Sequence, residues 1–249
     1  MEKKHLVLAS GSPRRKELLS QLGYEFSVLV TDVEECQHAQ ETAEEYVKRL
    51  SLDKALAALS LLKDNPSEKQ HVVPSSDNVV SSSDNVVPSS DNVVSSSEHV
   101  ASSSEHVVSS VDNVAVDSGT VALDSEIVVL GSDTVVVSHG QVLEKPTDFA
   151  DSKRMLTQLA NERHQVMTAV SVVSEEKQRT EIIITDVWFK PLSEQEIEQY
   201  WQTGEPCDKA GSYGIQGLGG CFVTRIEGSY YAVVGLPLYE TDQLLQEFL

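Results

Sequence analysis

The sequence predicts an α/β protein, and three observations support this fold class. Residues 6–9 form an apolar run, a short loop follows, and a helical pattern then extends to Gly23, which gives the order strand, loop, helix. Residues 24–30 predict a second strand, and β-branched runs on both sides of residues 131–134 predict more sheet. A chain of 249 residues can build one large α/β domain, or two small ones, around an ample core.

The loop between the first strand and the first helix carries the first candidate site. Ser12 can cap the helix, and Pro13 suits its first position because proline has no amide hydrogen there to leave unpaired. Arg14 and Arg15 then fall in the first turn, where a cation costs about 0.3–1 kcal/mol against the helix dipole. A bound phosphate would compensate this cost. Solvated surface charges at a strand–helix junction are the alternative.

Charge and cysteine content limit the classes of partner and compartment. The formal net charge of −20 argues against nucleic acid or an anionic membrane as the main partner, because both require basic surface. Cys36, Cys207 and Cys221 are odd in number and widely spaced, which fits a reducing, cytoplasmic compartment. No apolar run reaches the length of a membrane span, and the N-terminal apolar run is too short for a signal peptide. We therefore expect a cytoplasmic protein.

Acidic residues follow the second predicted strand. Residues 31–35 include three carboxylates, the last of them Glu35. Such a cluster is either a solvated turn or a place where a divalent cation is recruited next to an anion site. The sequence leaves both interpretations open.

Thr42 and Glu45 have the spacing of a capping box and predict a long helix over residues 46–62. Lys54 lies on the apolar stripe of this helix, four residues after Leu50. A lysine on such a stripe either extends its ammonium to the surface or directs it into a cleft toward a ligand phosphate. The predicted stripe comprises Tyr46, Leu50, Ala57 and Leu61.

Residues 72–120 form a seven-residue repeat rich in serine, aspartate and asparagine. Its apolar residues are adjacent rather than three and four apart, so the repeat does not predict a coiled coil. The composition is typical of a flexible, acidic insertion. His71, His99 and His106 could bind a metal in principle, but two of them occupy the same position of successive repeats. We expect the repeat to be dispensable for chemistry.

Asp133 and Thr134 lie between two β-branched runs, where a buried strand is expected to reach its exit. A buried carboxylate needs a partner or a metal, so Asp133 is the best single candidate for a catalytic acid or base. A turn aspartate between two short strands is the alternative. Lys145 follows shortly before a break, and Thr147 or Asp148 can start a helix that extends to residue 159.

The C-terminal part predicts strands at residues 165–173 and 181–189 and a helix that Ser193 caps and Gly204 ends. A glycine-rich loop follows at residues 205–220, whose backbone can approach a ligand closely. Gln216 is the polar side chain among the glycines; it suits the edge of a base, or it packs inside the loop. Residues 221–226 and 230–234 predict a hairpin, and residues 239–248 predict a final helix.

Taken together, these stretches closely resemble the Maf family of nucleotide pyrophosphatases, in family order and across nearly all of the chain except the repeat. The matching stretches are LASGSPRRKELL, TDVEE, SLDKA, GSDTVVV, LEKP, DKAGSYGIQGLGGCFV and IEGSYYAVVGLPL. The resemblance implies an α/β fold with an elongated, twisted mixed sheet flanked by helices, two lobes and a central cleft. It also implies a single domain of residues 1–249, interrupted by the low-complexity segment 72–120.

The resemblance further implies an activity, the hydrolysis of nucleoside triphosphates to monophosphate and pyrophosphate with a divalent cation, Mg²⁺ or Mn²⁺. The segment GIQGLGGCF resembles the branch of the family that acts on dTTP and UTP more than the branch that acts on 7-methyl-GTP. Members of the family are often dimeric. Two alternatives stay open: an inosine-triphosphate-type pyrophosphatase, and a regulator of division or septum formation without catalysis, with the repeat as its tether.

Roles for individual residues are also implied by the resemblance. The substrate-binding residues would be Ser10, Arg14, Arg15, Lys54 and Lys145. Glu35 and Asp133 would hold the metal, and Asp133 would also accept the proton of the attacking water. Substrate choice would depend on Arg14, Thr134 and Gln216. One departure is Ser132, which stands where the family commonly has alanine.

Overall fold

The computed structural model of the chain describes residues 4–64, 73–74 and 126–249. The expectations for the repeat, including those for its histidines, lie outside the described residues, apart from a two-residue strand. The described strands are β1 (His5–Leu8), β2 (Phe26–Val28), β3 (Val73–Pro74), β4 (Ile127–Ser138), β5 (Gln141–Leu143), β6 (Arg163–Val173), β7 (Gln178–Phe189) and β8 (Val223–Glu227). The α-helices are α1 (Pro13–Gln21), α2 (Ala43–Asp64), α3 (Phe149–Leu159), α4 (Glu194–Gln202), α5 (Tyr230–Val234) and α6 (Leu238–Gln246).

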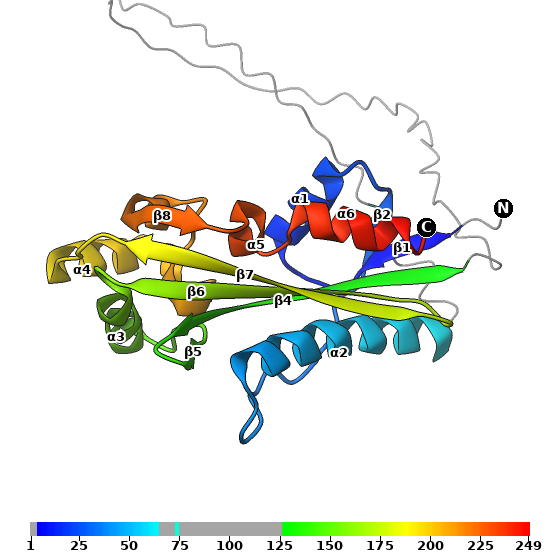
Figure 1. The fold of residues 1–249 in the computed structure, drawn as a ribbon, viewed down its shortest axis with the longest axis horizontal. Coiled ribbons are helices and arrows are strands. Elements are labelled where there is room, and N and C mark those ends of the chain that lie inside the picture. The colour runs from blue at the N-terminus through cyan, green and yellow to red at the C-terminus, as the bar shows by residue number, and fades with distance from the viewer. Residues whose placement is uncertain (1–3, 65–72, 75–125) are drawn as a thin grey trace, which may run out of the picture. The chain divides into compact units, whose positions relative to one another are not determined.

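The strands form one mixed sheet, which confirms the predicted α/β class. Its order is β3-β2-β1-β4-β6-β7-β8, and β5 pairs with β4 outside this path. β2, β1 and β4 are parallel, whereas β4, β6, β7 and β8 are antiparallel in succession. Figure 1 shows α2 on one side of the long strands and α1, α5 and α6 on the other. The helices therefore flank the sheet.

One edge of β4 changes partner halfway along its length. Its pairing with β1 ends at Leu130, and its pairing with β5 begins at Val136. Both partners lie on the same edge, because β6 occupies the opposite edge from Val129 to Val137. Among the described residues, positions 131–135 of β4 therefore face no strand on this edge. Asp133 and Thr134 lie within this gap in the sheet.

The helix starts follow the capping signals of the sequence. Ser12 caps α1 through the amide of Arg15, with Pro13 at the first helical position. Thr42 and Glu45 exchange hydrogen bonds at the start of α2, as Ser193 and Glu196 do at α4, and Asp148 caps α3. The predicted helices at residues 13–23, 46–62, 147–159, 194–204 and 239–248 are thus confirmed, with small shifts of their ends.

Three local expectations were wrong. The buried stripe of α2 includes Tyr46, Leu50 and Lys54, but Leu61 is exposed, because the helix turns the side that carries Ala55, Ala58 and Leu62 to the sheet. Residues 131–134 form neither a strand exit nor a turn, since β4 continues through them as one 12-residue strand. The hairpin does not form either: residues 230–234 are helix α5, which Ser229 caps through the amide of Ala232.

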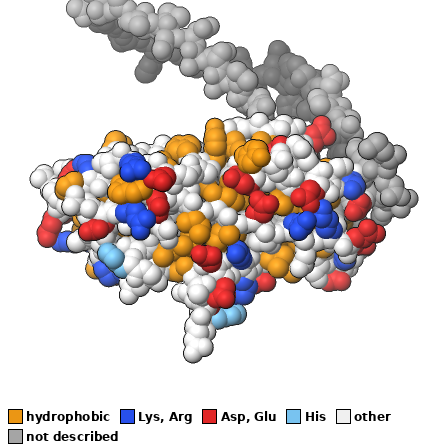
Figure 2. Space-filling view, viewed as in Figure 1, with side chains coloured by type: hydrophobic (Ala, Val, Ile, Leu, Met, Phe, Trp, Pro, Cys, Tyr) orange, Lys and Arg blue, Asp and Glu red, His pale blue; other side chains and the backbone are white. Residues whose placement is uncertain are grey.

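The apolar core lies on both sides of the gap in the sheet. One cluster joins α1 and α6 to β1 and β4, and a second joins α3 and α4 to β6 and β7. Figure 2 shows acidic and basic side chains interspersed with apolar ones on the face seen in that view. The expected absence of a nucleic-acid partner stays a prediction.

Candidate active site

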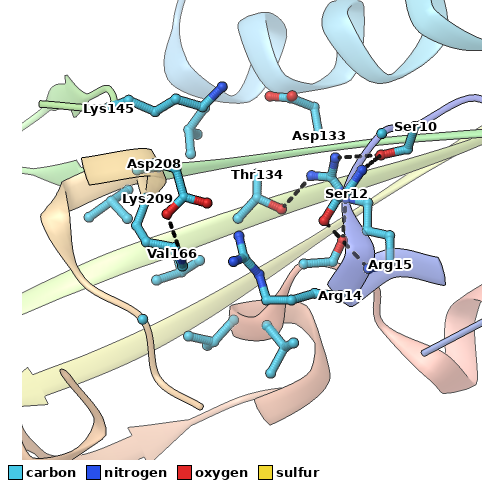
Figure 3. Close-up of a pocket in the computed structure, with 18 of the residues that line it drawn as sticks. Ser10, Ser12, Arg14, Arg15, Asp133, Thr134, Lys145, Val166, Asp208 and Lys209 are labelled. Carbon is cyan, nitrogen blue, oxygen red and sulfur yellow. Dashed lines mark hydrogen bonds and ion pairs between the residues drawn. The ribbon is translucent and has the colours of Figure 1, made fainter. Parts of the chain in front are cut away.

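A cavity of about 700 Å³ opens at the gap in β4. It collects segments that are far apart in the sequence: the β1–α1 loop, α2, β4, the residues after β5 and the glycine-rich loop. Every site residue that the sequence analysis named lines this one cavity, namely Ser10, Arg14, Arg15, Glu35, Lys54, Asp133, Thr134, Lys145 and Gln216. Figure 3 shows Ser10, Arg14 and Arg15 on one flank of β4 and Lys145 on the other. The basic residues that the sequence analysis named thus lie around one cavity, and their roles stay predictions.

Gly131 brings α2 close enough to β4 to place Lys54 beside Asp133. A Cβ atom at Gly131 would lie 2.3 Å from the backbone oxygen of Ser51 and 2.9 Å from the backbone nitrogen of Ala55, so only glycine allows this approach. The Ser51 hydroxyl also donates to the Gly131 carbonyl at 3.3 Å. Lys54 follows Ser51 by one helical turn, and Asp133 follows Gly131 by two strand positions on the same face. Close packing therefore determines this pair.

Lys54 is the buried centre of a network of charges that extends to the surface. Its Nζ lies 2.7 Å from Oδ1 of Asp133 and 2.5 Å from Oε1 of Glu35, and Lys145 Nζ lies 3.4 Å from Oε2 of Glu35. Lys54 is 9% exposed and Asp133 is 7% exposed. Burial would raise the pKa of Glu35, but the hydrogen bond and charge of Lys54 and the charge of Lys145 outweigh burial and lower it. Glu35 is therefore held ionised.

Arg15 approaches β4 from the opposite face. Its guanidinium donates to the Gly235 carbonyl at 2.9 Å, to the Ser10 hydroxyl at 3.4 Å and to the Thr134 hydroxyl at 3.2 Å. These acceptors are all neutral, and burial lowers the pKa of Arg15 despite the nearby charge of Asp133. A partly buried cation that is bound only by neutral oxygens is well placed to accept an anionic ligand. Figure 3 shows the guanidinium of Arg14 beside it, extending toward the centre of the cavity.

The hydroxyl of Thr134 has its direction fixed by Thr168. The Thr168 hydroxyl donates to the Ala232 carbonyl at 2.6 Å, so the 3.0 Å contact between the two hydroxyls uses the hydrogen of Thr134. The Thr134 oxygen is then left as an acceptor, which the Arg15 guanidinium uses. Thr134 thus joins the guanidinium to the wall of the cavity, and its proposed part in substrate choice stays a prediction.

Gln216 lies on the exposed side of the cavity, in the glycine-rich loop. The loop folds into three short 3-10 helices, η2 (Glu205–Asp208), η3 (Ala210–Ser212) and η4 (Leu218–Phe222). Gln216 precedes η4, and it is exposed while lining the cavity. An exposed side chain excludes the packing interpretation of this glutamine. Its part in reading a base stays a prediction.

Several lining residues were not found from the sequence. Glu144 and Tyr46 line the cavity near Asp133; burial raises the pKa of Glu144, and the charges of Asp133 and Glu35 add to this effect. Burial also raises the pKa of the Tyr46 hydroxyl, and the charge of Glu144 adds to this effect. Glu205 lines the other end. The only signal for Glu144 was its position next to Lys145, and Glu205 looked like an ordinary residue at a helix end.

The carboxylates of the cavity fit a divalent cation that is shared with a substrate. Within the residues the structure describes, no three His, Cys, Asp or Glu side chains are grouped as a complete metal site. Glu35 and Asp133 nevertheless converge on one ammonium, so their oxygens share one small region. Mg²⁺ is commonly bound by one or two carboxylates together with substrate phosphates and waters. The donor set fits such an ion better than a closed protein site.

Comparison with known proteins adds independent information. The family model described as Maf-like protein matches residues 5–111 and 90–248. The dTTP/UTP pyrophosphatase of Vibrio parahaemolyticus is 55% identical over 244 residues, which cover 98% of this chain and 97% of that protein. The proteins of the same name from Vibrio cholerae and Pectobacterium atrosepticum are 51% and 42% identical, over 98% of this chain and 97% and 92% of their own lengths.

In the parts of the chain for which the structure gives coordinates, no helix combines the length and the apolar character that crossing a membrane requires. The family model and the relatives together cover nearly every residue from β1 to α6. This chain belongs to the Maf family.

Proposed function

We propose that the protein hydrolyses nucleoside triphosphates, with dTTP and UTP as its preferred substrates, to the monophosphate and pyrophosphate. The observation that carries this proposal is the cavity at the gap in β4, where the buried Lys54, the partly buried Arg14 and Arg15 and the exposed Lys145 surround two converging carboxylates. Relatives named dTTP/UTP pyrophosphatase, up to 55% identical, support the substrate class. The cavity of about 700 Å³ has the size of small-molecule sites and suits a nucleotide.

The cations of the cavity are proposed to hold the triphosphate. Arg14 and Arg15 come from the N-terminal turn of α1, whose free amides and dipole also favour an anion. Ser10 supports Arg15 and supplies a hydroxyl, and Lys145 meets the same anion from the other flank. Phosphoryl transfer depends mostly on positioning and on fixed positive charge around the reacting phosphate. These residues provide both.

Asp133 is proposed as the group that accepts the proton of the attacking water. The ammonium of Lys54 holds Oδ1 at 2.7 Å, which fixes the carboxylate on the face of β4 that borders the cavity. The water attacks the α-phosphorus, its proton passes to Asp133, and the bond to the bridging oxygen breaks, with pyrophosphate as the leaving group. A divalent cation, Mg²⁺ or Mn²⁺, held by Glu35 and Asp133 would neutralise charge on the phosphates.

A panel of nucleotides with the purified full chain tests the proposal. Pyrophosphate release is measured from dTTP, UTP, dCTP, ITP and 7-methyl-GTP, with Mg²⁺, with Mn²⁺ and with a chelator. Release from dTTP and UTP that requires the cation supports the proposal. Preference for ITP would indicate the inosine-triphosphate-type alternative. No release from any nucleotide would leave only the regulatory alternative. No contact among the described residues supports that alternative.

The repeat is proposed to be dispensable within a single catalytic domain of residues 1–249. Segments before and after residues 72–120 line the same cavity, for example Lys54 and Asp133. Deletion of residues 76–119 would retain β3 and test this proposal directly. Turnover of the preferred nucleotide should stay within about twofold. A folded deletion variant without activity would contradict the proposal.

A cytoplasmic location and a homodimer complete the proposal. The free, exposed state of Cys36, Cys207 and Cys221 supports a reducing compartment. Light scattering of the purified chain tests the dimer, for which the resemblance to dimeric members of the family is the support. Fractionation of cells that express a tagged chain tests the location.

A further inference from the structure

The segment that presents Gln216 is a closed turn. The amide of Gly217 donates to the Gly214 carbonyl at 3.3 Å, so residues 214–217 close on themselves. Gln216 is the exposed side chain of this turn that lines the cavity together with Glu205. A turn with two glycines has little intrinsic rigidity, because glycine loses the most conformational freedom on ordering. Its position must come from contacts outside it.

Tyr200 and Glu205 supply these contacts at the two ends of the turn. The Tyr200 hydroxyl accepts from the amide of Gly214 at 3.1 Å and donates to Oε1 of Glu205 at 2.7 Å. Glu205 accepts from the amide of Leu218 at 2.8 Å through Oε2 and from the amide of Gly219 at 3.0 Å through Oε1. The two side chains are thus bonded to each other and to the backbone before and after the turn.

The charge state and the space around Glu205 fit this role. Burial would raise its pKa, but the Gly219 amide, the Tyr200 hydroxyl and the Leu218 amide outweigh burial and lower it. A Cβ atom at Gly217 would lie 2.3 Å from Oε2 of Glu205, and one at Gly219 would lie 2.5 Å from the Tyr200 hydroxyl. These glycines make room for the two side chains.

We propose that Tyr200 and Glu205 are positioning residues for base recognition: they clamp the turn at residues 214–217 so that Gln216 faces the base. The inference rests on the proposed function and on the expectation that Gln216 reads the base. Among the described residues, no hydrogen bond or ion pair joins Tyr200 or Glu205 to the cations proposed to hold the phosphates, which are Arg14, Arg15, Lys54 and Lys145. Its loss should therefore affect recognition of the base and leave the binding of the phosphates unchanged.

The test compares Glu205→Gln, Glu205→Ala and Tyr200→Phe with the wild-type chain. The matched control is Glu196→Gln, which removes a carboxylate that accepts from the Ser193 amide on the same helix as Tyr200 but lies outside the cavity. The measurements are kcat and KM for dTTP, UTP and dCTP, and the inhibition constant of inorganic tripolyphosphate, which carries phosphates but no base.

Glu205→Ala should raise KM for dTTP about tenfold or more and reduce the preference for dTTP over dCTP, while kcat changes less. Glu205→Gln should have a smaller effect, because the amide oxygen retains one acceptor. The tripolyphosphate constant should stay within about twofold in all variants, which also shows that the phosphate site is folded. An unchanged base preference in both Glu205→Ala and Tyr200→Phe would overturn the inference, as would an equal loss in Glu196→Gln.

A double-mutant cycle separates the clamp from a general loss of structure. In the Gln216→Ala background, Glu205→Gln should cause no further loss of base preference, because the clamp acts through Gln216. A full additional loss would show that Glu205 acts by another route. If the wild-type chain releases no pyrophosphate from any nucleotide, the proposed function fails first. If it does release pyrophosphate and Gln216→Ala keeps the wild-type base preference, only the present inference fails.

Discussion

The two sides of the cavity are built in different ways. On the side of β4 and α2, Asp133 and Lys54 belong to long, regular elements and are nearly buried. On the side of the glycine-rich loop, Gln216 is exposed and belongs to a short turn. The first side is positioned by strand register and helix packing, the second by two side chains. The groups proposed to take part in the reaction are thus held by the core, and the group proposed to select the substrate is held by the hydrogen bonds of Tyr200 and Glu205.

This difference predicts different responses to mutation. A change on the β4 side alters charges that few water molecules screen, so it should affect the rate strongly. A change on the loop side alters hydrogen bonds at the surface of the cavity, which are worth less because water can replace them. The following substitutions examine this contrast, beginning with the largest expected effect.

Asp133→Asn should reduce kcat by about 10²–10⁴, because the amide cannot accept a proton from the attacking water. Binding of a nucleotide should be largely preserved, since the amide has almost the volume of the carboxylate. Turnover assays measure the effect on kcat, and calorimetric titration with a non-hydrolysable dTTP analogue measures the effect on binding. Near-normal turnover would remove Asp133 from its proposed role.

Lys54→Met should reduce kcat/KM by about 10- to 100-fold. The substitution leaves Glu35 and Asp133 without the ammonium that both contact, and it removes a cation from the proposed phosphate site. Lys63→Met on the same helix is the matched control, because Lys63 pairs with Glu175 at the surface. Equal activity of the two variants would show that this network of charges contributes nothing to the reaction.

The sequence predicted much of this fold because its signals were local. Ser12, Pro13, the pair Thr42 and Glu45, and Ser193 each determine a helix start through contacts within one turn. The hairpin expected at residues 221–234 failed for a non-local reason. The carbonyls of Ala232 and Gly235 accept hydrogen bonds from side chains that lie far away in the sequence. The donors are Thr168, Ser132 and Arg15, and these bonds accompany a helical turn at residues 230–234.

The candidate site was predicted in its members more than in its geometry. The resemblance to a family named every residue that was expected in the cavity, and all of them line it. The sequence placed Asp133 at a strand end, however, because Asp133 and Thr134 lie between two β-branched runs. Gly131 is the point where α2 touches β4. The clamp formed by Tyr200 and Glu205 gave no signal, since its partners are backbone amides that any sequence provides.

Gly131→Ala tests whether close packing positions the β4 side. The added methyl group would lie 2.3 Å from the Ser51 carbonyl, so α2 must move away from the sheet. We expect a loss of about 1–3 kcal/mol in the free energy of unfolding, measured by denaturant titration, together with lower activity as Lys54 separates from Asp133. Gly23→Ala is the control: a Cβ atom there meets open space, and only its positive φ adds strain. Gly23→Ala should lower stability without changing kcat/KM per folded molecule.

Gln216→Ala should change the preference among bases by about tenfold while altering kcat for the preferred nucleotide little, which is the smaller effect expected of the loop side. The measurement is the ratio of kcat/KM for dTTP to that for dCTP. An unchanged ratio would remove Gln216 from substrate choice. A large fall in kcat would contradict the separation of the two sides.

The smallest effect at neutral pH is expected from a substitution of His164, which contacts Tyr213 in the glycine-rich loop. Its Nε2 lies 2.9 Å from the Tyr213 hydroxyl, directly before the turn that presents Gln216, and burial lowers its pKa to about 4 despite the charge of Asp186. In the unfolded chain the pKa returns to about 6.5, so between these values the unfolded state binds a proton that the folded state excludes. The free energy of unfolding should therefore decrease as the pH is lowered through this window. The total decrease should reach about 3 kcal/mol at pH 4.

His164→Gln should remove this part of the pH dependence while retaining a hydrogen-bonding side chain for Tyr213. Denaturant titrations between pH 7 and 4 measure the slope, and His139→Gln serves as the control because His139 is exposed. Carboxylates other than Asp186, whose charge acts on His164, contribute alike to all three chains and cancel in the comparison. The same slope in wild type and His164→Gln would show that the histidine is not the acid-sensitive group. A reduced slope would show that protonation of His164 destabilises the fold next to the glycine-rich loop, away from the paired charges around Asp133.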